Sequence, residues 1–259
     1  FTPMSSTPSA PTPPVSLIGG GPGAWDLITV RGMHRLQAAD VIIADHLGPT
    51  AELDKLCDVA TKTIIDASKL PYGKQVAQEK INAYIVDNAR AGRTVARLKG
   101  GDPYVFGRGF EELQACAAEG IAVEVIPGVT SAISVPALFG IPVSMRGVVH
   151  NFTVISGHLP PGHPQSLNNW EALAATGGTL AIIMGVKNGP AIADALIGHG
   201  MDPNTPTAVI QEGSTDGERG VRTTLSQLGR SIADNHIAPP AVIIIGDVAG
   251  LEATGGAGG

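Results

Sequence analysis

Glycine-rich segments follow four short apolar runs of this 259-residue chain. Residues 19–24 read GGGPGA, residues 97–103 read RLKGGDP, residues 126–132 read IPGVTSA and residues 183–186 read IMGV. Glycine lets the backbone approach a ligand closely, and aspartate and hydroxyl side chains form hydrogen bonds with amines and sugar hydroxyls. The four segments therefore predict a binding site for a small molecule that carries such groups.

The surrounding pattern predicts that short strands position these segments. Runs of β-branched residues alternate with amphipathic stretches, which is typical of an α/β fold with a mostly parallel sheet covered by helices. Ligands of such sheets bind at the carboxyl ends of the strands. The expected strands are residues 15–18, 41–44, 94–98, 122–126, 152–155, 179–184, 207–210, 221–224 and 241–245. The expected helices are residues 29–39, 77–91, 109–119, 168–175, 189–199 and 225–235.

The first glycine segment permits a different interpretation. Residues 19–24 match the dinucleotide pattern G-x-G-x-x-A, and Asp45 ends the next expected strand, where an acid would bind the ribose of NAD. Against this, Pro22 removes a backbone donor from the turn. The expected helix cap, Thr29, also comes too late in the chain for the helix to face a phosphate. An NAD site is therefore disfavoured, and a tight turn without a ligand is the second alternative.

The composition restricts the classes of protein that fit. Hydrophobic residues make up 43% and charged residues 15% of the chain, as in globular proteins. A net charge of -6 disfavours a nucleic-acid-binding surface. Cys57 and Cys116 lack metal-ligand spacing with other cysteines or histidines, so we expect reduced thiols and no metal. The sequence has no membrane-spanning apolar run and no signal-peptide pattern, which predicts a cytoplasmic protein without membrane contact.

Two domains and two flexible ends are expected. Residues 1–14 are rich in proline, serine and threonine and predict a disordered linker or cloning remnant, since the chain begins with phenylalanine. Residues 15–145 form the expected N-terminal α/β domain, which contains the glycine-rich loop and the catalytic candidates. Residues 146–251 form the expected C-terminal α/β domain, and residues 252–259 are a glycine-rich tail.

Long stretches of the sequence resemble the uroporphyrinogen-III C-methyltransferases, within the tetrapyrrole methylase family. The resemblance extends over nearly all of residues 15–250, with matches that include VSLIGGGPGAWDLIT and GIPVSMRG, and its most specific run is RLKGGDPYVFGRG with VIPGVTSAIS. It implies two α/β domains with S-adenosyl-L-methionine (SAM) in the cleft between them, and a homodimer. It also implies two successive methyl transfers that convert uroporphyrinogen III to precorrin-2, in sirohaem or cobalamin biosynthesis.

The resemblance also implies the site residues. The residues expected to contact SAM are Pro22, Gly100, Gly101, Asp102, Val105, Thr130, Ser131, Met184, Gly213 and Ala241. Asp45 and Lys69 match the two residues proposed for proton transfer in the family. Lys69 lies between serine and leucine where the family usually has glycine and arginine, so Lys74 is an alternative. His46 stands where the family often has arginine.

The implied chemistry agrees with these residue types. Methyl transfer from a sulfonium needs an in-line approach of a nucleophilic carbon and no metal. A carboxylate such as Asp45 is a suitable proton acceptor, and Lys69 is a suitable donor. Uroporphyrinogen III carries eight carboxylates, so its site needs cations. We expect Arg108 and Arg146 to bind the substrate. Weaker cationic candidates are Arg31, Arg35, Lys69 and Lys99, each of which on its own is more typical of a surface charge.

Other functions remain open at this point. A later precorrin methylase or a diphthine synthase would share the glycine loop and the GGDP motif. An NAD-dependent oxidoreductase would bind a different cofactor, and a ligand sensor on the same scaffold would bind SAM without turnover. Residues 1–14 also fit the end of a linker to an N-terminal dehydrogenase/ferrochelatase module, as found in some sirohaem synthases.

Overall fold

The computed structural model describes residues 13–45, 49–67 and 74–252, with the backbone alone for residues 74–77. The chain divides into two compact units, Phe1–Val129 and Thr130–Gly259. This division falls before the boundary expected between residues 145 and 146, because helix α4 (Ser131–Leu138) packs on the sheet of the second unit. The expected linker and tail lie almost wholly outside the described residues.

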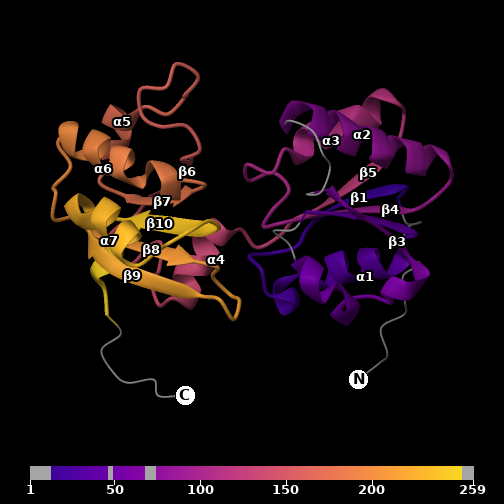
Figure 1. The fold of residues 1–259 in the computed structure, drawn as a ribbon, viewed down its shortest axis with the longest axis horizontal. Helices are drawn as coiled ribbons and strands as arrows, with labels where there is room; N and C mark the ends of the chain where they lie inside the picture. Colours follow the sequence, from indigo (N-terminus) through magenta and orange to yellow (C-terminus); the bar gives the residue numbers. More distant parts are fainter. Residues whose placement is uncertain (1–12, 46–48, 68–73, 253–259) are drawn as a thin grey trace. The chain divides into compact units, whose positions relative to one another are not determined.

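Five parallel strands form the sheet of the first unit in the order β3-β2-β4-β1-β5 (Figure 1). The strands are β1 (Val15–Gly19), β2 (Val41–Ala44), β3 (Thr63–Asp66), β4 (Val95–Lys99) and β5 (Val123–Ile126). The predicted parallel sheet is confirmed, but β3 was not expected. This strand is short, lies at the sheet edge and is only partly buried, so it lacks a continuous apolar run.

Helices cover both faces of the first sheet. They are α1 (Val30–Ala38), α2 (Lys74–Arg90) and α3 (Gly109–Ala118). Successive side chains of a strand point to opposite faces. In β1, Ile18 packs with Leu36 of α1, and Leu17 packs in a second cluster with Ile85 of α2. Figure 1 shows α1 on one side and α2 and α3 on the other. Each fully buried aliphatic side chain contributes about 1.5–3 kcal/mol to stability.

The sheet of the second unit is mixed. Its strands are β6 (Phe152–Ser156), β7 (Thr179–Ile183), β8 (Pro206–Gln211), β9 (Arg219–Thr224) and β10 (Ala241–Ile245), in the order β6-β7-β10-β8-β9. Strands β6 and β7 are parallel, whereas β10 runs antiparallel to both β7 and β8. We expected residues 183–186 to follow a strand of a parallel sheet. Strand β7, which they follow, is parallel to its neighbour β6 but antiparallel to its other neighbour β10, so the expectation is half correct.

Helices also cover both faces of the second sheet. One face carries α5 (Trp170–Ala175), α6 (Gly189–Gly198) and α7 (Leu228–Asp234). The other face carries α4, whose Ala132 and Val135 pack against Val242 and Ile244 of β10. The central strand β10 is thus buried on both sides, which explains its uninterrupted run of β-branched residues.

Glycines bring the loops after β1, β4 and β5 into main-chain contact. Gly101 N donates to Gly21 O (2.7 Å), and Gly21 N donates to Gly101 O (3.2 Å). A Cβ on Gly19 would lie 2.5 Å from Gly128 Cα, and a Cβ on Gly128 would overlap Gly101 O. The three loops can meet only because these positions lack side chains.

We expect Gly128→Ala to destabilise the protein, because the added methyl group meets the backbone of two other loops. Overpacking against a backbone that cannot move away costs about 2 kcal/mol, which for a chain of this size lowers Tm by about 4–8 °C. Thermal unfolding followed by circular dichroism measures this. Gly198→Ala is the matched control, since its Cβ would meet nothing within 4 Å. An equal Tm for the two variants would contradict the crowding argument.

Candidate functional site

The main chain of the first glycine segment is already engaged by a neighbouring loop. Gly20 N donates to Lys99 O (2.7 Å), and Gly21 is paired with Gly101. Helix α1 begins only at Val30, after Thr29 Oγ1 accepts from Gly32 N (3.1 Å) as predicted. These amides cannot also bind a pyrophosphate, and the helix starts too far along the chain to help. The geometry therefore argues against the dinucleotide interpretation.

Asp102 joins the loop after β4 to the loop after β5. Its Oδ1 accepts from Tyr104 N (2.8 Å), and its Oδ2 accepts from Gly128 N (2.9 Å). Charge-assisted hydrogen bonds of this kind are about twice as strong as neutral ones. The residue expected to bind a ligand thus also fixes the shape of the edge on which Gly100 and Gly101 lie.

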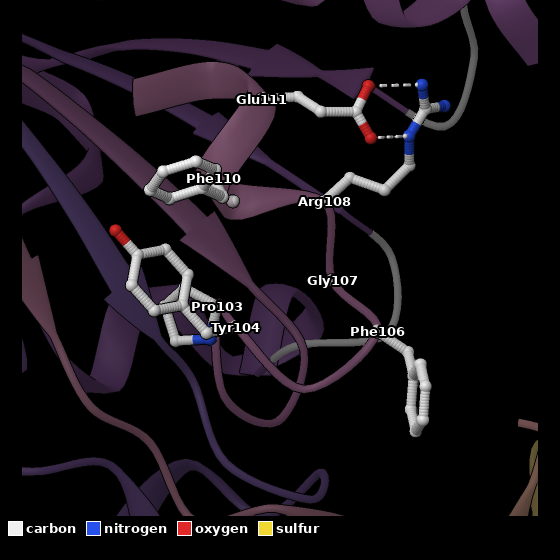
Figure 2. A pocket seen from close by; sticks show the side chains of 8 residues that line it. Pro103, Tyr104, Phe106, Gly107, Arg108, Phe110 and Glu111 are labelled. Carbon is white, nitrogen blue, oxygen red and sulfur yellow. Dashed lines mark hydrogen bonds and ion pairs between the residues drawn. The ribbon is translucent and has the colours of Figure 1, made fainter. Parts of the chain in front are cut away.

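The segment after Asp102 forms a small pocket of aromatic and charged side chains (Figure 2). Its volume is about 250 Å³. Phe106 and Arg108 have left-handed backbone conformations, with φ of 52° and 57°, which side-chain-bearing residues seldom adopt. Gly107 and Gly109 pack so closely on Pro103 that a Cβ would lie 2.8 and 2.6 Å from its carbonyl oxygen. Such strain is typical of functional loops. The pocket is lined by Pro103, Tyr104, Phe106, Gly107, Arg108, Gly109, Phe110 and Glu111.

Arg108 forms a two-pronged ion pair with Glu111 in this pocket. Nε donates to Oε1 (2.9 Å) and Nη2 donates to Oε2 (2.7 Å). The hydrogen bonds to Glu111 raise the pKa of Arg108, and those from Arg108 lower the pKa of Glu111. Both side chains are exposed, at 43% and 50%. The guanidinium can therefore exchange this carboxylate for one on a ligand.

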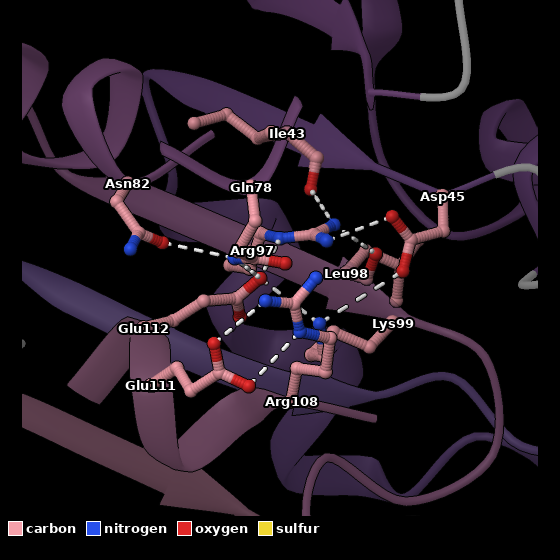
Figure 3. Close-up of polar contacts among 10 residues, drawn as sticks. All are labelled: Ile43, Asp45, Gln78, Asn82, Arg97, Leu98, Lys99, Arg108, Glu111 and Glu112. Carbon is pink, nitrogen blue, oxygen red and sulfur yellow. Dashed lines mark hydrogen bonds and ion pairs between the residues drawn. The ribbon is translucent and has the colours of Figure 1, made fainter. Parts of the chain in front are cut away.

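A buried charge network lies at the ends of β2 and β4; it consists of Asp45, Arg97, Lys99 and Glu112 (Figure 3). Arg97 Nη2 donates to Asp45 Oδ1 (2.7 Å), and Arg97 Nε donates to Glu112 Oε1 (3.0 Å). Lys99 Nζ donates to the same Glu112 oxygen (3.0 Å) and lies 3.9 Å from Asp45 Oδ2. Only the Asp45 side chain, 30% exposed, reaches solvent.

The network gives its two cations different acid–base properties. Burial lowers the pKa of Lys99, and the neighbouring Arg97 charge lowers it further. Burial also acts to lower the pKa of Arg97, but the carboxylates of Glu112 and Asp45 outweigh it and raise the pKa above its ordinary value. Arg97 is therefore the permanent cation beside Asp45.

Sequence reasoning missed part of this network. Lys99 was expected to be a surface charge or a substrate-binding cation, but its side chain is buried on Glu112, so the surface charge is wrong. Arg97 and Glu112 were not considered as functional residues. The signal was a charged residue at alternate positions of the apolar strand VARLK, because such charges need partners when the strand is buried.

In the second unit, three of the predicted ligand contacts lie near the ends of β7 and β8 and the start of β10. The strand register sets the last residues of β7 and β8 against the first two residues of β10. Met184 and Gly213 follow β7 and β8, and Ala241 begins β10. Met184 is 50% exposed, with a left-handed φ of 56°. A Cβ on Gly213 would lie 2.5 Å from Val135 Cγ1, so this glycine is also needed for packing of α4.

Thr130 and Ser131 lie at the start of α4. Thr130 is the N-cap, and its Oγ1 accepts from Ala132 N (3.4 Å). Ser131 is the first helical residue. In the first unit, Pro22 and Val105 are half-buried in the loops after β1 and β4. The structure thus places each predicted SAM contact in a loop at a strand end, at a helix start or at the start of a strand.

The remaining candidates are mostly cations, and only some of them lie among the described residues. Arg35 pairs with Glu124 (2.6 Å) and Arg31 lies 3.7 Å from the same residue, which leaves neither as a free cation. Arg146 is exposed in the turn bridged by Met145 and Val149. Lys69 and His46 lie outside the described residues, as does the side chain of Lys74, where α2 begins.

Membrane-spanning helices and metal-binding clusters are both absent from the described residues. None of the helices there is long and apolar enough to cross a membrane. No group of three or more histidine, cysteine, aspartate or glutamate side chains in that part of the chain has a metal-binding arrangement.

Comparisons with known proteins identify the family of this chain. Residues 14–229 match the family model of the tetrapyrrole (corrin/porphyrin) methylases. The chain is 42% identical to an S-adenosyl-L-methionine-dependent uroporphyrinogen III methyltransferase of Methanosarcina barkeri, over 92% of each chain. It is 40% identical to the siroheme synthase of Tolumonas auensis, aligned over 93% of this chain and 50% of that protein. It therefore spans about half the length of that relative.

A solved structure extends the likeness to the fold. The uroporphyrin-III C-methyltransferase of Thermus thermophilus, complexed with S-adenosyl homocysteine, is 35% identical and superposes with a TM-score of 0.73. The match covers 90% of this chain and 97% of that one. The order of the motifs, the two sheets and the family match lead to one conclusion: this chain belongs to the tetrapyrrole methylase family.

Proposed function

We propose that this protein catalyses the SAM-dependent C-methylation of uroporphyrinogen III to precorrin-2 by two methyl transfers, in sirohaem or cobalamin biosynthesis. The observation that carries the proposal is the similarity to the Methanosarcina barkeri enzyme, at 42% identity over 92% of both chains. The similarity to siroheme synthase supports the sirohaem branch. The proposal needs a SAM site, a proton acceptor and cations for the substrate.

The glycine-lined strand ends fit SAM as the methyl donor. Gly101 and Gly128 bring three loops together at one edge of the first sheet, where a side chain on Gly128 would collide with the backbone of the other loops. Met184 is exposed, and a thioether side chain adapts well to an apolar ligand surface. The residues that we propose to contact SAM are Pro22, Gly100, Gly101, Asp102, Val105, Thr130, Ser131, Met184, Gly213 and Ala241.

Asp45 is the proposed proton acceptor. When bound, SAM supplies an electrophilic methyl group: its S–CH₃ bond breaks as a C–C bond forms to the pyrrole carbon, and the tetrapyrrole then loses one proton. Asp45 suits this role because its carboxylate is partly exposed and is held in place by the hydrogen bond from Arg97. Lys69 remains the proposed proton donor on the basis of the resemblance alone.

The pocket that contains Arg108 fits the periphery of the substrate. Arg108 already holds the carboxylate of Glu111 with two hydrogen bonds, which shows that its geometry suits a carboxylate. Tyr104 and Phe110 pack edge to face beside it, with ring centroids 6.0 Å apart, and offer apolar surface to a pyrrole ring. We therefore assign Arg108, with Arg146 as a second candidate, to the propionate and acetate groups of the substrate.

Homodimer formation and a cytoplasmic location complete the proposal. Both follow from the family resemblance and from the sequence composition described above. Light scattering coupled to size-exclusion chromatography measures the first, and twice the chain mass of 26.4 kDa is the expected result.

The reaction itself is tested by turnover. We expect the purified protein, given SAM and enzymatically generated uroporphyrinogen III without oxygen, to form the dimethylated product, detected by its absorbance. Binding of S-adenosylhomocysteine is measured in parallel by calorimetry. Binding without product would show a sensor or a methylase with another substrate, and the absence of binding would contradict the proposal altogether.

Asp45→Asn should slow turnover about 100-fold or more, because the amide cannot accept the proton. The affinity for S-adenosylhomocysteine should stay within about twofold of the original. Asp87→Asn, at an exposed position on α2, is the matched control and should retain full turnover. Full activity of Asp45→Asn would remove this carboxylate from the mechanism.

Arg108→Gln should raise KM for uroporphyrinogen III about tenfold or more, because a charged hydrogen bond to the substrate is worth about 1.5–3 kcal/mol. The Kd for S-adenosylhomocysteine should not change. The control is Arg230→Gln, which breaks an exposed intrahelical pair with Asp234 on α7. A changed Kd together with an unchanged KM would place Arg108 at the cofactor instead.

A further inference from the structure

Arg97 has its guanidinium fixed on every side. The residue is 1% exposed. Its Nη1 donates to Ile43 O (3.3 Å) and Leu98 O (3.1 Å), in addition to the bonds from Nε to Glu112 and from Nη2 to Asp45. Because the guanidinium is planar and rigid, these four bonds set the direction of the bond to Asp45.

Glu112 anchors Arg97 from the opposite side. Its side chain is completely buried on α3. Besides Arg97 and Lys99, its Oε1 accepts from Gln78 Nε2 (3.3 Å), and the same Gln78 nitrogen also donates to Asn82 Oδ1 (2.9 Å) on α2. Helix α2 and helix α3 are thus both tied to the strand that carries Arg97. The bonds that Glu112 accepts all end on one of its carboxylate oxygens, which therefore links Arg97 to both helices.

The two oxygens of the Asp45 carboxylate have different surroundings. Oδ1 accepts the 2.7 Å bond from Arg97, whereas Oδ2 has Lys99 Nζ at 3.9 Å, beyond hydrogen-bond distance. Among the described residues, the charged groups that face Asp45 are Arg97 and Lys99 from β4, with Glu112 of α3 behind them. On the neighbouring strand β3, Asp66 is in register with the residue before Asp45. One oxygen is therefore held and the other is available for a proton.

We infer that Arg97 is a positioning residue, anchored on Glu112, that holds Asp45 Oδ1 and so directs Oδ2 toward the substrate. The inference rests on the proposed function, in which Asp45 accepts the proton. Arg97 does not touch the substrate and acts only through Asp45. A merely structural role would lower activity whether or not Asp45 is present.

A double-mutant cycle separates these roles. We expect Arg97→Gln to lower kcat about tenfold or more, with Kd for S-adenosylhomocysteine unchanged within about twofold. In an Asp45→Asn background the same substitution should lower kcat no further. Arg90→Gln, which breaks an exposed pair with Glu119, is the control and should leave kcat unchanged.

A second variant distinguishes loss of positioning from loss of folding. Arg97→Gln alone leaves Glu112 with less positive charge around it, whereas Arg97→Gln combined with Glu112→Gln keeps one cation and one anion in the network. The combined variant should show the same fall in kcat at nearly normal Tm. Additive losses in the Asp45→Asn background would overturn the positioning role while leaving Asp45 as the acceptor. Full activity of Asp45→Asn by itself would overturn both.

Discussion

The main-chain contact between the loops after β1, β4 and β5 is the constraint on which the first unit depends. It requires the absence of a side chain at Gly19 and Gly128, and it is reinforced by the bonds that Asp102 accepts from two loops. Strand β4 carries Arg97 and Lys99, and the chain after it continues through the loop into the pocket that contains Arg108. Residues 97–111 thereby connect the glycine-lined loops, two cations of the charge network and the pocket.

The charge network shows how such a site can be buried at acceptable cost. Isolated charges are strongly disfavoured inside a protein, but here each cation has a carboxylate within 3.0 Å. The only member in contact with solvent is the one to which we assign chemistry. Burial of the other three confers order on Asp45 that an exposed ion pair would not provide.

Much of the fold could be predicted from the sequence because its signals are local. The β-branched runs, the cap at Thr29 and the glycines after strands identified most elements. Strand β3 and helix α4 escaped, the first because it is a short edge strand and the second because Pro136 lies inside it. The glycine-rich motifs lie in loops at strand ends, as expected from the sequence. The partners of Asp45 were missed because Glu112 and Arg97 meet only through packing of α3 on the sheet.

The first turn of α3 has a consequence for engineering. Glu111 and Glu112 are adjacent in sequence, yet one pairs with Arg108 at the surface and the other anchors the interior beneath Asp45. The loop that lines the pocket therefore cannot be exchanged independently of α3. A graft that exchanges residues 103–111 to alter the accepted tetrapyrrole would rotate or shift the helix turn that carries Glu112. Transplants of this loop should include the whole of α3, together with the residues of α2 that hold it.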